Sequence, residues 1–166
     1  MFLGSIAGWF SSSMATGWGC YCAGKMALIA ITKALRTEVK PFGITVTMCE
    51  PGFFRTPILS SASGRGIVYG ELKGTIDDYN ESMGKFYSMI EMANGNQPGS
   101  PEKGGERIVQ ALKGEGALEG WNKGPDAIPE RWGLGDDSYQ PVEAFLKEEG
   151  ENLMKWKGLT QGVNID

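Results

Sequence analysis

The strongest constraint on this fold is a helix that is followed at once by a strand. Residues 21–40 carry small and branched apolar side chains at helical spacing, and Pro41 ends the helix. Residues 44–49 form a β-branched run of strand length, which Pro51 and Gly52 end with a turn. Because helix and strand are joined by a short turn, this order predicts one step of a doubly wound α/β sheet.

The rest of the chain alternates helical segments with loops that hold many of its 25 glycines. Residues 57–98, which follow the strand, give mixed signals typical of a lid or a substrate loop. Gly104 and Gly105 disfavour one of the predicted helices. The other predicted elements are a strand end at 1–3, a loop at 4–19, and helices at 77–93, 101–112 and 142–156.

Composition narrows the class of function. The chain has 166 residues, which suits one domain, with 41% hydrophobic and 22% charged residues. Its net charge of −4 argues against a nucleic-acid partner, which requires a basic surface. No apolar run reaches the roughly 18 residues that a membrane span needs, so we expect no membrane partner.

The cysteines and the absence of histidine narrow the chemistry further. Three cysteines give an odd count without metal-like spacing, which favours reduced thiols and a cytoplasmic protein. No histidine is present, which excludes Ser-His-Asp and Cys-His catalysis and most zinc sites. We therefore expect no metal site. A general acid or base must be Tyr, Lys, Asp, Glu or Cys.

Tyr21 and Lys25 are candidates for that acid–base chemistry. They are four residues apart at the start of the predicted helix, which puts both side chains on one face. A lysine ammonium beside a phenol favours the phenolate, and such a tyrosine can exchange a proton with a carbonyl or alcohol oxygen. The pair alone is weak support, because a surface contact of tyrosine with lysine has the same spacing.

The surrounding segments resemble the short-chain dehydrogenase/reductase family. That family has a serine-containing loop, then Tyr-x-x-x-Lys, a helix, a strand and a Pro-Gly-x-x-x-Thr turn. The matching segments here are Gly4 to Trp9, Tyr21 to Lys25, Lys33 to Thr56 and Gly95 to Lys103, with a looser match at Arg131 to Asp136. The resemblance implies that residues 1–166 are the carboxyl-terminal catalytic half of a Rossmann-like domain.

The resemblance also implies roles for individual residues. Tyr21 corresponds to the catalytic acid/base, Lys25 to the residue that stabilises the phenolate and binds the nicotinamide ribose, and Ser5 to the serine that orients the substrate oxygen. With Tyr21 and Lys25, the turn residues would complete the contacts to NADP or NAD. These turn residues are Pro51, Gly52, Phe53 and Thr56. The implied reaction interconverts a small-molecule carbonyl and an alcohol.

The spacing before Tyr21 departs from the family pattern. Ser5 precedes Tyr21 by 16 residues, about three more than is usual in the family, an excess that a loop can absorb. Either the loop bulges outward and Ser5 keeps its role, or Ser5 is displaced. In the second case Ser11, Ser12 and Ser13 are its substitutes.

A larger departure is that no Gly-x-x-x-Gly-x-Gly turn follows a strand, although such a turn would hold the cofactor pyrophosphate. Met1 falls where the family's central strand would end, so a truncated gene or gene model is one explanation. Three hypotheses stay open: an oxidoreductase completed by a missing half, a non-catalytic remnant that binds a partner, and a cofactor-free isomerase or cyclase of secondary metabolism. The helix at 21–40 is the surface expected to bind that partner or to form a homo-oligomer.

Overall fold

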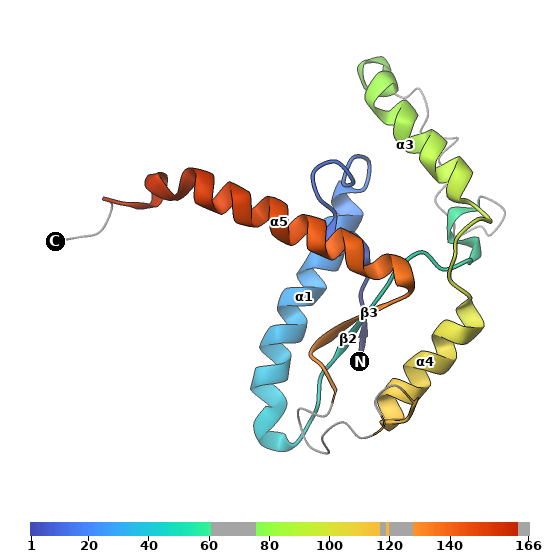
Figure 1. The fold of residues 1–166 in the computed structure, drawn as a ribbon, viewed down its shortest axis with the longest axis vertical. Coiled ribbons are helices and arrows are strands. Elements are labelled where there is room, and N and C mark those ends of the chain that lie inside the picture. Colours follow the sequence, from blue (N-terminus) through green and yellow to red (C-terminus); the bar gives the residue numbers. More distant parts are fainter. Residues whose placement is uncertain (61–75, 117–118, 120–127, 163–166) are drawn as a thin grey trace.

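The computed structural model describes residues 1–60, 76–116, 119 and 128–162, which fold around a three-stranded parallel sheet (Figure 1). Its strands are β1 (Phe2–Leu3), β2 (Met48–Pro51) and β3 (Arg131–Leu134), in the order β1-β2-β3. Phe2 pairs with Met48, which also pairs with Arg131. With helices on both sides of this sheet, the predicted α/β class is confirmed.

Helix α1 (Gly19–Val39) is the helix predicted at 21–40. A short 3₁₀ turn, η2 (Lys40–Phe42), extends it to Gly43, whose φ of 70° closes the end as glycine readily does. Thr32 in the middle of α1 is fully buried, and its hydroxyl donates to the Leu28 carbonyl and lies 3.6 Å from Met48 Sδ. At Thr32 the helix therefore packs directly against β2.

The strand predicted at 44–49 begins later than its sequence suggests. Ile44 is exposed, and the paired residues of β2 start only at Met48, where neighbours exist on both sides. Just before this strand, the Thr47 carbonyl accepts from the Phe2 N–H at 2.9 Å, and the Thr47 hydroxyl donates to the Pro129 carbonyl at 2.7 Å. The β-branched run marks extended backbone, whereas the partner strands decide where the ladder begins.

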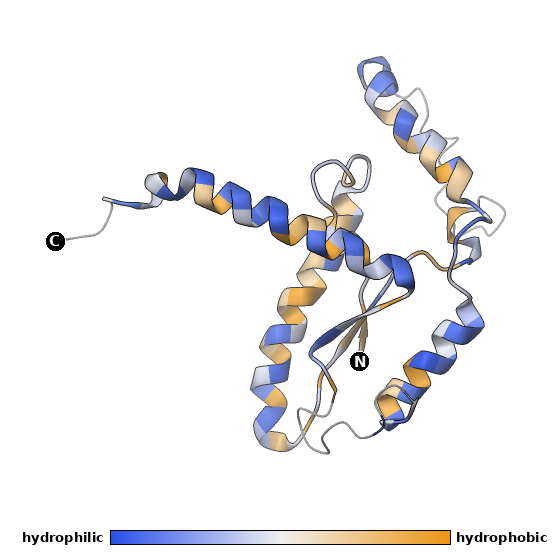
Figure 2. Cartoon of the chain, in the orientation of Figure 1, coloured by the Kyte–Doolittle hydropathy of each residue, from blue (hydrophilic) through white to orange (hydrophobic). Residues whose placement is uncertain are grey.

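The other predicted helices are present as well. Helix α3 (Asn80–Ala93) follows the 3₁₀ turn η5 (Asp77–Tyr79), α4 (Pro101–Lys113) is capped by Ser100, and α5 (Tyr139–Trp156) is the last α-helix of the described chain. In Figure 1, α1 and α4 lie on opposite sides of the sheet, and α5 (Tyr139–Trp156) crosses the body and then projects away from it. Figure 2 shows α5 as mainly hydrophilic with scattered apolar positions. Four short 3₁₀ elements complete the chain: η1 (Ile6–Trp9), η3 (Pro57–Leu59), η7 (Asp136–Ser138) and η8 (Lys157–Thr160).

The main apolar core lies beside the start of α1 rather than under the sheet. It joins η1 and the loop after it to η3 and to one face of α3, where Phe86 and Ile90 are buried. Trp18 packs its ring against Phe10 and Phe86 with centroids 6.4 and 5.4 Å apart. Aromatic contacts of this kind fix the loop at 4–19, which the sequence indicates only as Ser- and Gly-rich.

The two adjacent glycines of α4 should respond oppositely to alanine. A Cβ at Gly104 would lie 2.5 Å from Cε1 of Phe54, whereas a Cβ at Gly105 meets nothing within 4 Å. We expect Gly105→Ala to stabilise the fold by about 1 kcal/mol, the helix propensity difference, and Gly104→Ala to destabilise it by about 1–3 kcal/mol through overpacking. Urea unfolding, monitored by circular dichroism, measures the stability of both variants. Equal changes in the free energy of unfolding would contradict this packing.

The three cysteines should differ in thiol reactivity. Cys49 is fully buried in β2, and burial together with the Glu50 carboxylate raises its pKa to about 12. Cys20 is exposed, and burial raises the pKa of Cys22. In the native protein at neutral pH, maleimide should therefore modify Cys20 first and leave Cys49 intact, because the thiolate is the reactive form. Mass spectrometry of the labelled peptides tests this; equal labelling of Cys20 and Cys49 would refute it.

Candidate active site

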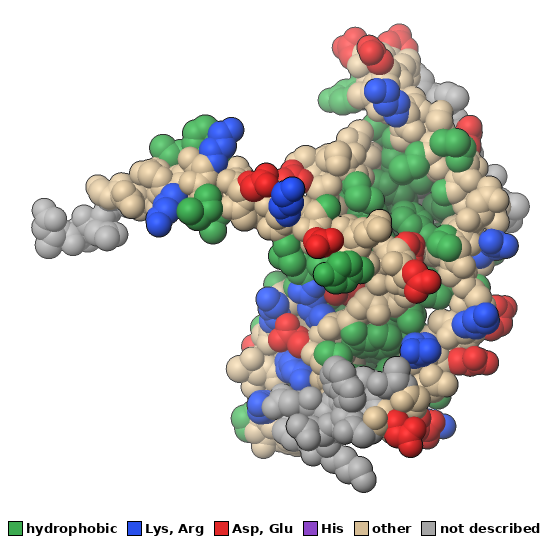
Figure 3. Space-filling view, in the orientation of Figure 1, with side chains coloured by type: hydrophobic (Ala, Val, Ile, Leu, Met, Phe, Trp, Pro, Cys, Tyr) green, Lys and Arg blue, Asp and Glu red, His purple; other side chains and the backbone are tan. Residues whose placement is uncertain are grey.

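A cavity of about 450 Å³ opens at the carboxyl ends of the strands, where ligands of open α/β sheets bind. Figure 3 shows apolar side chains gathered in the hollow between α3, α4 and the body. All seven predicted catalytic and cofactor-binding residues line this one cavity, from the start of η1, from α1, and from the end of β2 with the turn that follows it. They are Ser5, Tyr21, Lys25, Pro51, Gly52, Phe53 and Thr56. Of the predicted substrate loop, residues 61–75 lie outside the described residues.

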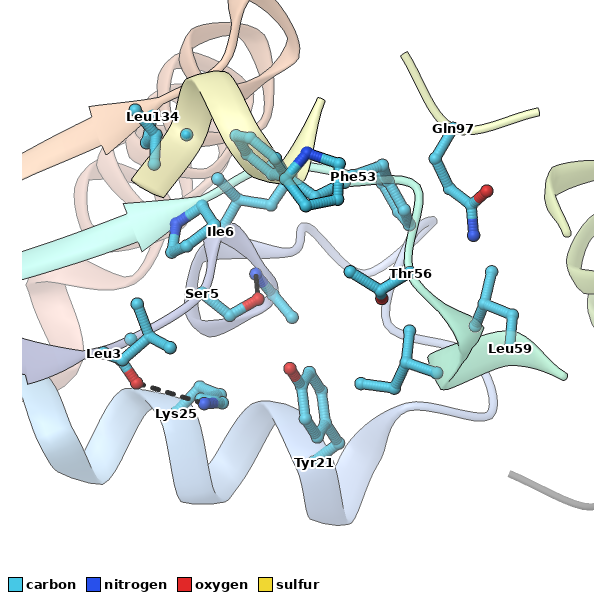
Figure 4. A pocket seen from close by; sticks show the side chains of 18 of the residues that line it. Leu3, Ser5, Ile6, Tyr21, Lys25, Phe53, Thr56, Leu59, Gln97 and Leu134 are labelled. Atoms are coloured by element: carbon cyan, nitrogen blue, oxygen red, sulfur yellow. Dashed lines mark hydrogen bonds between the residues drawn. The ribbon is translucent and has the colours of Figure 1, made fainter. Parts of the chain in front are cut away.

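Tyr21 and Lys25 lie one turn apart on the face of α1 that borders the cavity (Figure 4). Tyr21 is 38% exposed, so its hydroxyl is accessible to a ligand. The Lys25 Nζ atom is 5.5 Å from the centre of the Tyr21 ring and donates to the Leu3 carbonyl at 3.2 Å. The end of β1 therefore positions the lysine beside the phenol. Burial lowers the pKa of Lys25 from its ordinary value.

Ser5 stands at the start of η1, on the opposite wall from Tyr21 (Figure 4). Its Oγ accepts a hydrogen bond from the Ala7 backbone N–H at 3.1 Å, which leaves the hydroxyl proton available to a ligand. The three alternative serines make other contacts. The Oγ atoms of Ser11 and Ser13 lie 3.2 Å from each other, and Ser12 donates a hydrogen bond to the Glu148 carboxylate of α5. Among the described serines, Ser5 is therefore the one placed at this wall.

The turn after β2 is held by the last residue of β3 and by the segment that follows it. The Gly52 N–H donates to the Leu134 carbonyl at 2.8 Å, and the Phe53 N–H donates to Asp137 Oδ2 at 2.7 Å. A Cβ at Gly52 would collide with the Asp137 carboxylate. Glycine is thus required at this position for the close approach of Asp137, a contact between distant segments that the sequence does not reveal.

Glu50 has no function assignable from sequence, but the structure shows it at the centre of a buried network. Its Oε1 accepts from the Trp9 indole N–H at 2.6 Å, and its Oε2 forms an ion pair with Arg131 at 3.1 Å. The Arg131 guanidinium also stacks 3.9 Å from the centre of the Trp9 ring. This network joins η1, β2 and β3 directly behind the Pro51–Gly52 turn.

Two further cavity residues were missed by sequence reasoning, Trp18 and Gln97. Both are buried, and the polar atoms of both side chains lack a hydrogen-bond partner among the described residues. The segments 1–60, 76–116 and 128–162 with residue 119 contain no group of three or more side chains arranged to hold a metal ion. No helix in the described part of the chain is long and apolar enough to cross a membrane.

Comparison with known proteins gives a consistent set of relatives. Residues 2–65 match the family model described as short chain dehydrogenase. Mouse retinol dehydrogenase 5 is 44% identical over 50 residues, which cover 30% of this chain and 16% of that protein. Rat retinol dehydrogenase 16 is 33% identical over 79 residues, which cover 46% of this chain and 25% of that protein. An uncharacterized oxidoreductase of Bacillus subtilis is 29% identical over 90 residues, which cover 54% of this chain and 31% of that protein.

A solved structure resembles almost the whole chain. The short-chain dehydrogenase from Streptomyces avermitilis superposes with a TM-score of 0.63 at 27% identity, covering 98% of this chain and 50% of that one. The chain thus spans half the length of this solved relative, and its alignments to the curated relatives above cover 16–31% of their length. The predicted Rossmann-like arrangement of strands and helices is confirmed by this similarity.

Proposed function

We propose that this chain, which belongs to the short-chain dehydrogenase/reductase family, is the carboxyl-terminal half of an NAD(P)-dependent oxidoreductase that interconverts a carbonyl and an alcohol. The observation that carries the proposal is the convergence of Ser5, Tyr21 and Lys25 on one cavity from two segments of the chain. The largely apolar lining of that cavity suits a lipophilic small molecule. The three free thiols support a cytoplasmic location.

The residues present fit the nicotinamide-ribose end of the cofactor. Lys25 Nζ can donate three hydrogen bonds and uses one on the Leu3 carbonyl, which leaves two for ribose hydroxyls. The turn from Pro51 to Thr56 supplies the opposite wall of the cavity. When bound, the nicotinamide would supply or accept the hydride. The described residues contain no glycine-rich turn for the pyrophosphate, so affinity of this chain alone should be weak.

The proton would move at the Tyr21 hydroxyl. In carbonyl reduction Tyr21 gives its proton to the substrate oxygen, and the Lys25 ammonium stabilises the phenolate that remains. Ser5 donates its free hydroxyl proton to the same oxygen while its lone pair stays on the Ala7 N–H. Two donors on one oxygen favour the oxygen charge that develops in the transition state.

Cofactor titration tests the proposal directly. We expect NADH or NADPH fluorescence to change on addition of the purified chain, with weakened binding in Lys25→Met because the ribose donors are lost. Lys33→Met is the matched control, because Lys33 lies on the same helix and does not line the cavity. No binding at millimolar concentrations of either cofactor would reject redox catalysis by this chain on its own.

A partner-binding role is the second candidate, favoured by exposed apolar side chains on two elements. Leu3 is 56% exposed on β1, which has β2 as its one neighbour among the described strands, and Ile31 on α1 is 49% exposed. An open sheet edge at β1 and an exposed apolar side chain on α1 both favour association with another protein chain, including a homo-oligomer through α1. Light scattering would support this role if Ile31→Lys converts an oligomer to a monomer; a monomeric wild-type chain would reject the homo-oligomer.

A further inference from the structure

Gln97 is a buried amide whose side chain has no protein partner. The residue is 3% exposed, and neither Nε2 nor Oε1 has a hydrogen-bond partner among the described residues. Buried polar groups are nearly always paired, because an unpaired one forfeits its hydrogen bonds to water without replacement. This side chain also lines the cavity that contains Tyr21 and Lys25. An unpaired amide at the wall of a cavity is suited to bind a ligand.

The backbone around Gln97 is fixed against the turn after β2. The Gly99 N–H donates to the Phe53 carbonyl at 3.0 Å, and the Arg55 N–H donates to the Gly99 carbonyl at 2.8 Å. Arg55 Nε donates to the Gln97 carbonyl at 3.1 Å. Pro98 further restricts the backbone of the residue before it. The backbone that carries the amide is therefore fixed before any ligand arrives, which reduces the entropy that binding costs.

The surroundings of the amide are apolar and lie away from the Tyr21–Lys25 pair. Figure 4 shows the Gln97 amide extending toward the space between Thr56 and Leu59, across the cavity from Lys25. Phe53 and Leu59 contribute apolar side chains to the same wall. A substrate whose carbonyl oxygen meets the Tyr21 hydroxyl would extend its other end toward this amide.

We propose that Gln97 binds a second polar group of the substrate, a hydroxyl that both donates and accepts a hydrogen bond, and so selects hydroxylated carbonyl or alcohol substrates. The inference rests on the proposed function for the identity of the reacting group. An amide oxygen accepts the hydroxyl proton while the amide N–H donates to the hydroxyl oxygen. In an otherwise apolar pocket, a substrate that lacks this hydroxyl leaves the amide unpaired and is discriminated against.

Binding of paired probes to the purified chain tests this without requiring turnover. The probes are short α,ω-alkanediols, each compared by calorimetry with the primary alkanol of the same chain length. We expect one diol to bind about tenfold more tightly than its alkanol, the size of effect that a buried hydrogen-bonded hydroxyl gives. Gln97→Met should reverse this preference, because it replaces the amide by an apolar chain of similar size.

Two further variants make the test specific. Gln97→Asn withdraws the amide by one methylene and should move the preference to the next longer diol. Gln140→Leu removes an exposed glutamine of α5 that does not line the cavity and should leave the wild-type preference unchanged. The melting temperature of Gln97→Met should equal or exceed that of the wild type, because no protein hydrogen bond is lost.

The outcomes separate this inference from the proposed function. Lost cofactor binding with an intact diol preference would reject the oxidoreductase and retain the Gln97 site. Equal diol preferences in wild type and Gln97→Met would overturn the Gln97 site, as would a Gln97→Met chain that fails to fold. The site is also overturned if Gln97→Met weakens NADH or NADPH binding while the diol preference is unchanged, because the amide would then serve the cofactor carboxamide.

Discussion

Replacement of Tyr21 with phenylalanine should lower kcat/KM for carbonyl reduction by about 10²–10⁴-fold, the contribution of a positioned general acid. The substitution removes one oxygen and keeps the ring. Trp18 lies 5.6 Å from that ring between centroids, and Lys25 Nζ lies 5.5 Å from its centre, so both contacts survive. The affinity for cofactor should therefore change little, and the loss should fall on kcat.

Initial rates of NAD(P)H oxidation with a panel of lipophilic ketones measure this effect. Tyr139→Phe is the control, because Tyr139 begins α5, is exposed and does not line the cavity. Lys25→Met should also lose activity but with weakened cofactor binding, which separates the two roles. Turnover retained by Tyr21→Phe would exclude Tyr21 as the acid and leave Ser5 and Thr56 as the described hydroxyls that line the cavity.

The local features of the fold were predictable because they depend on nearby residues. The start and end of α1 follow from its apolar spacing and from Pro41, and the α4 cap follows from Ser100 before Pro101. The strand predicted at 44–49 overlaps the observed strand β2, Met48–Pro51, only at residues 48 and 49. Pairing depends on β1 and β3, which are distant in sequence, so local pattern cannot set that boundary.

The candidate site likewise contains residues that the local sequence identifies and residues whose position depends on distant contacts. The spacing of Tyr21 and Lys25 is a property of one helix, and their juxtaposition with the Pro51–Gly52 turn follows from family resemblance. Glu50 and Gln97 could not be found, because polar residues are usually exposed and burial is decided by distant contacts. Arg131, the partner of Glu50, is 81 residues away. A weak signal for Glu50 exists in the sequence, because this acid directly follows the apolar run predicted as a strand at 44–49.

Replacement of Arg131 with methionine should destabilise the fold by about 3–5 kcal/mol, the cost of removing one partner of a buried ion pair. The Arg131 and Glu50 side chains are 14% and 5% exposed, so water can solvate the remaining carboxylate only poorly. Two guanidinium nitrogens donate to Glu50 Oε2, at 3.1 and 3.2 Å, and the stacking on Trp9 is also lost. The free energy of unfolding of a folded protein is about 5–15 kcal/mol in total, so this loss is a large part of it.

A double-mutant cycle decides whether the damage comes from the unpaired charge. Adding Glu50→Met to Arg131→Met removes that charge, and the double variant should regain most of the lost stability, because buried ion pairs are often replaceable by apolar groups. Lys147→Met provides the control, since its pair with Glu151 is exposed. Purely additive losses in urea unfolding would show instead that packing around Trp9 dominates. Because Glu50 immediately precedes the Pro51–Gly52 turn, a double variant that folds but loses cofactor affinity would indicate that the network fixes the cavity wall as well as the fold.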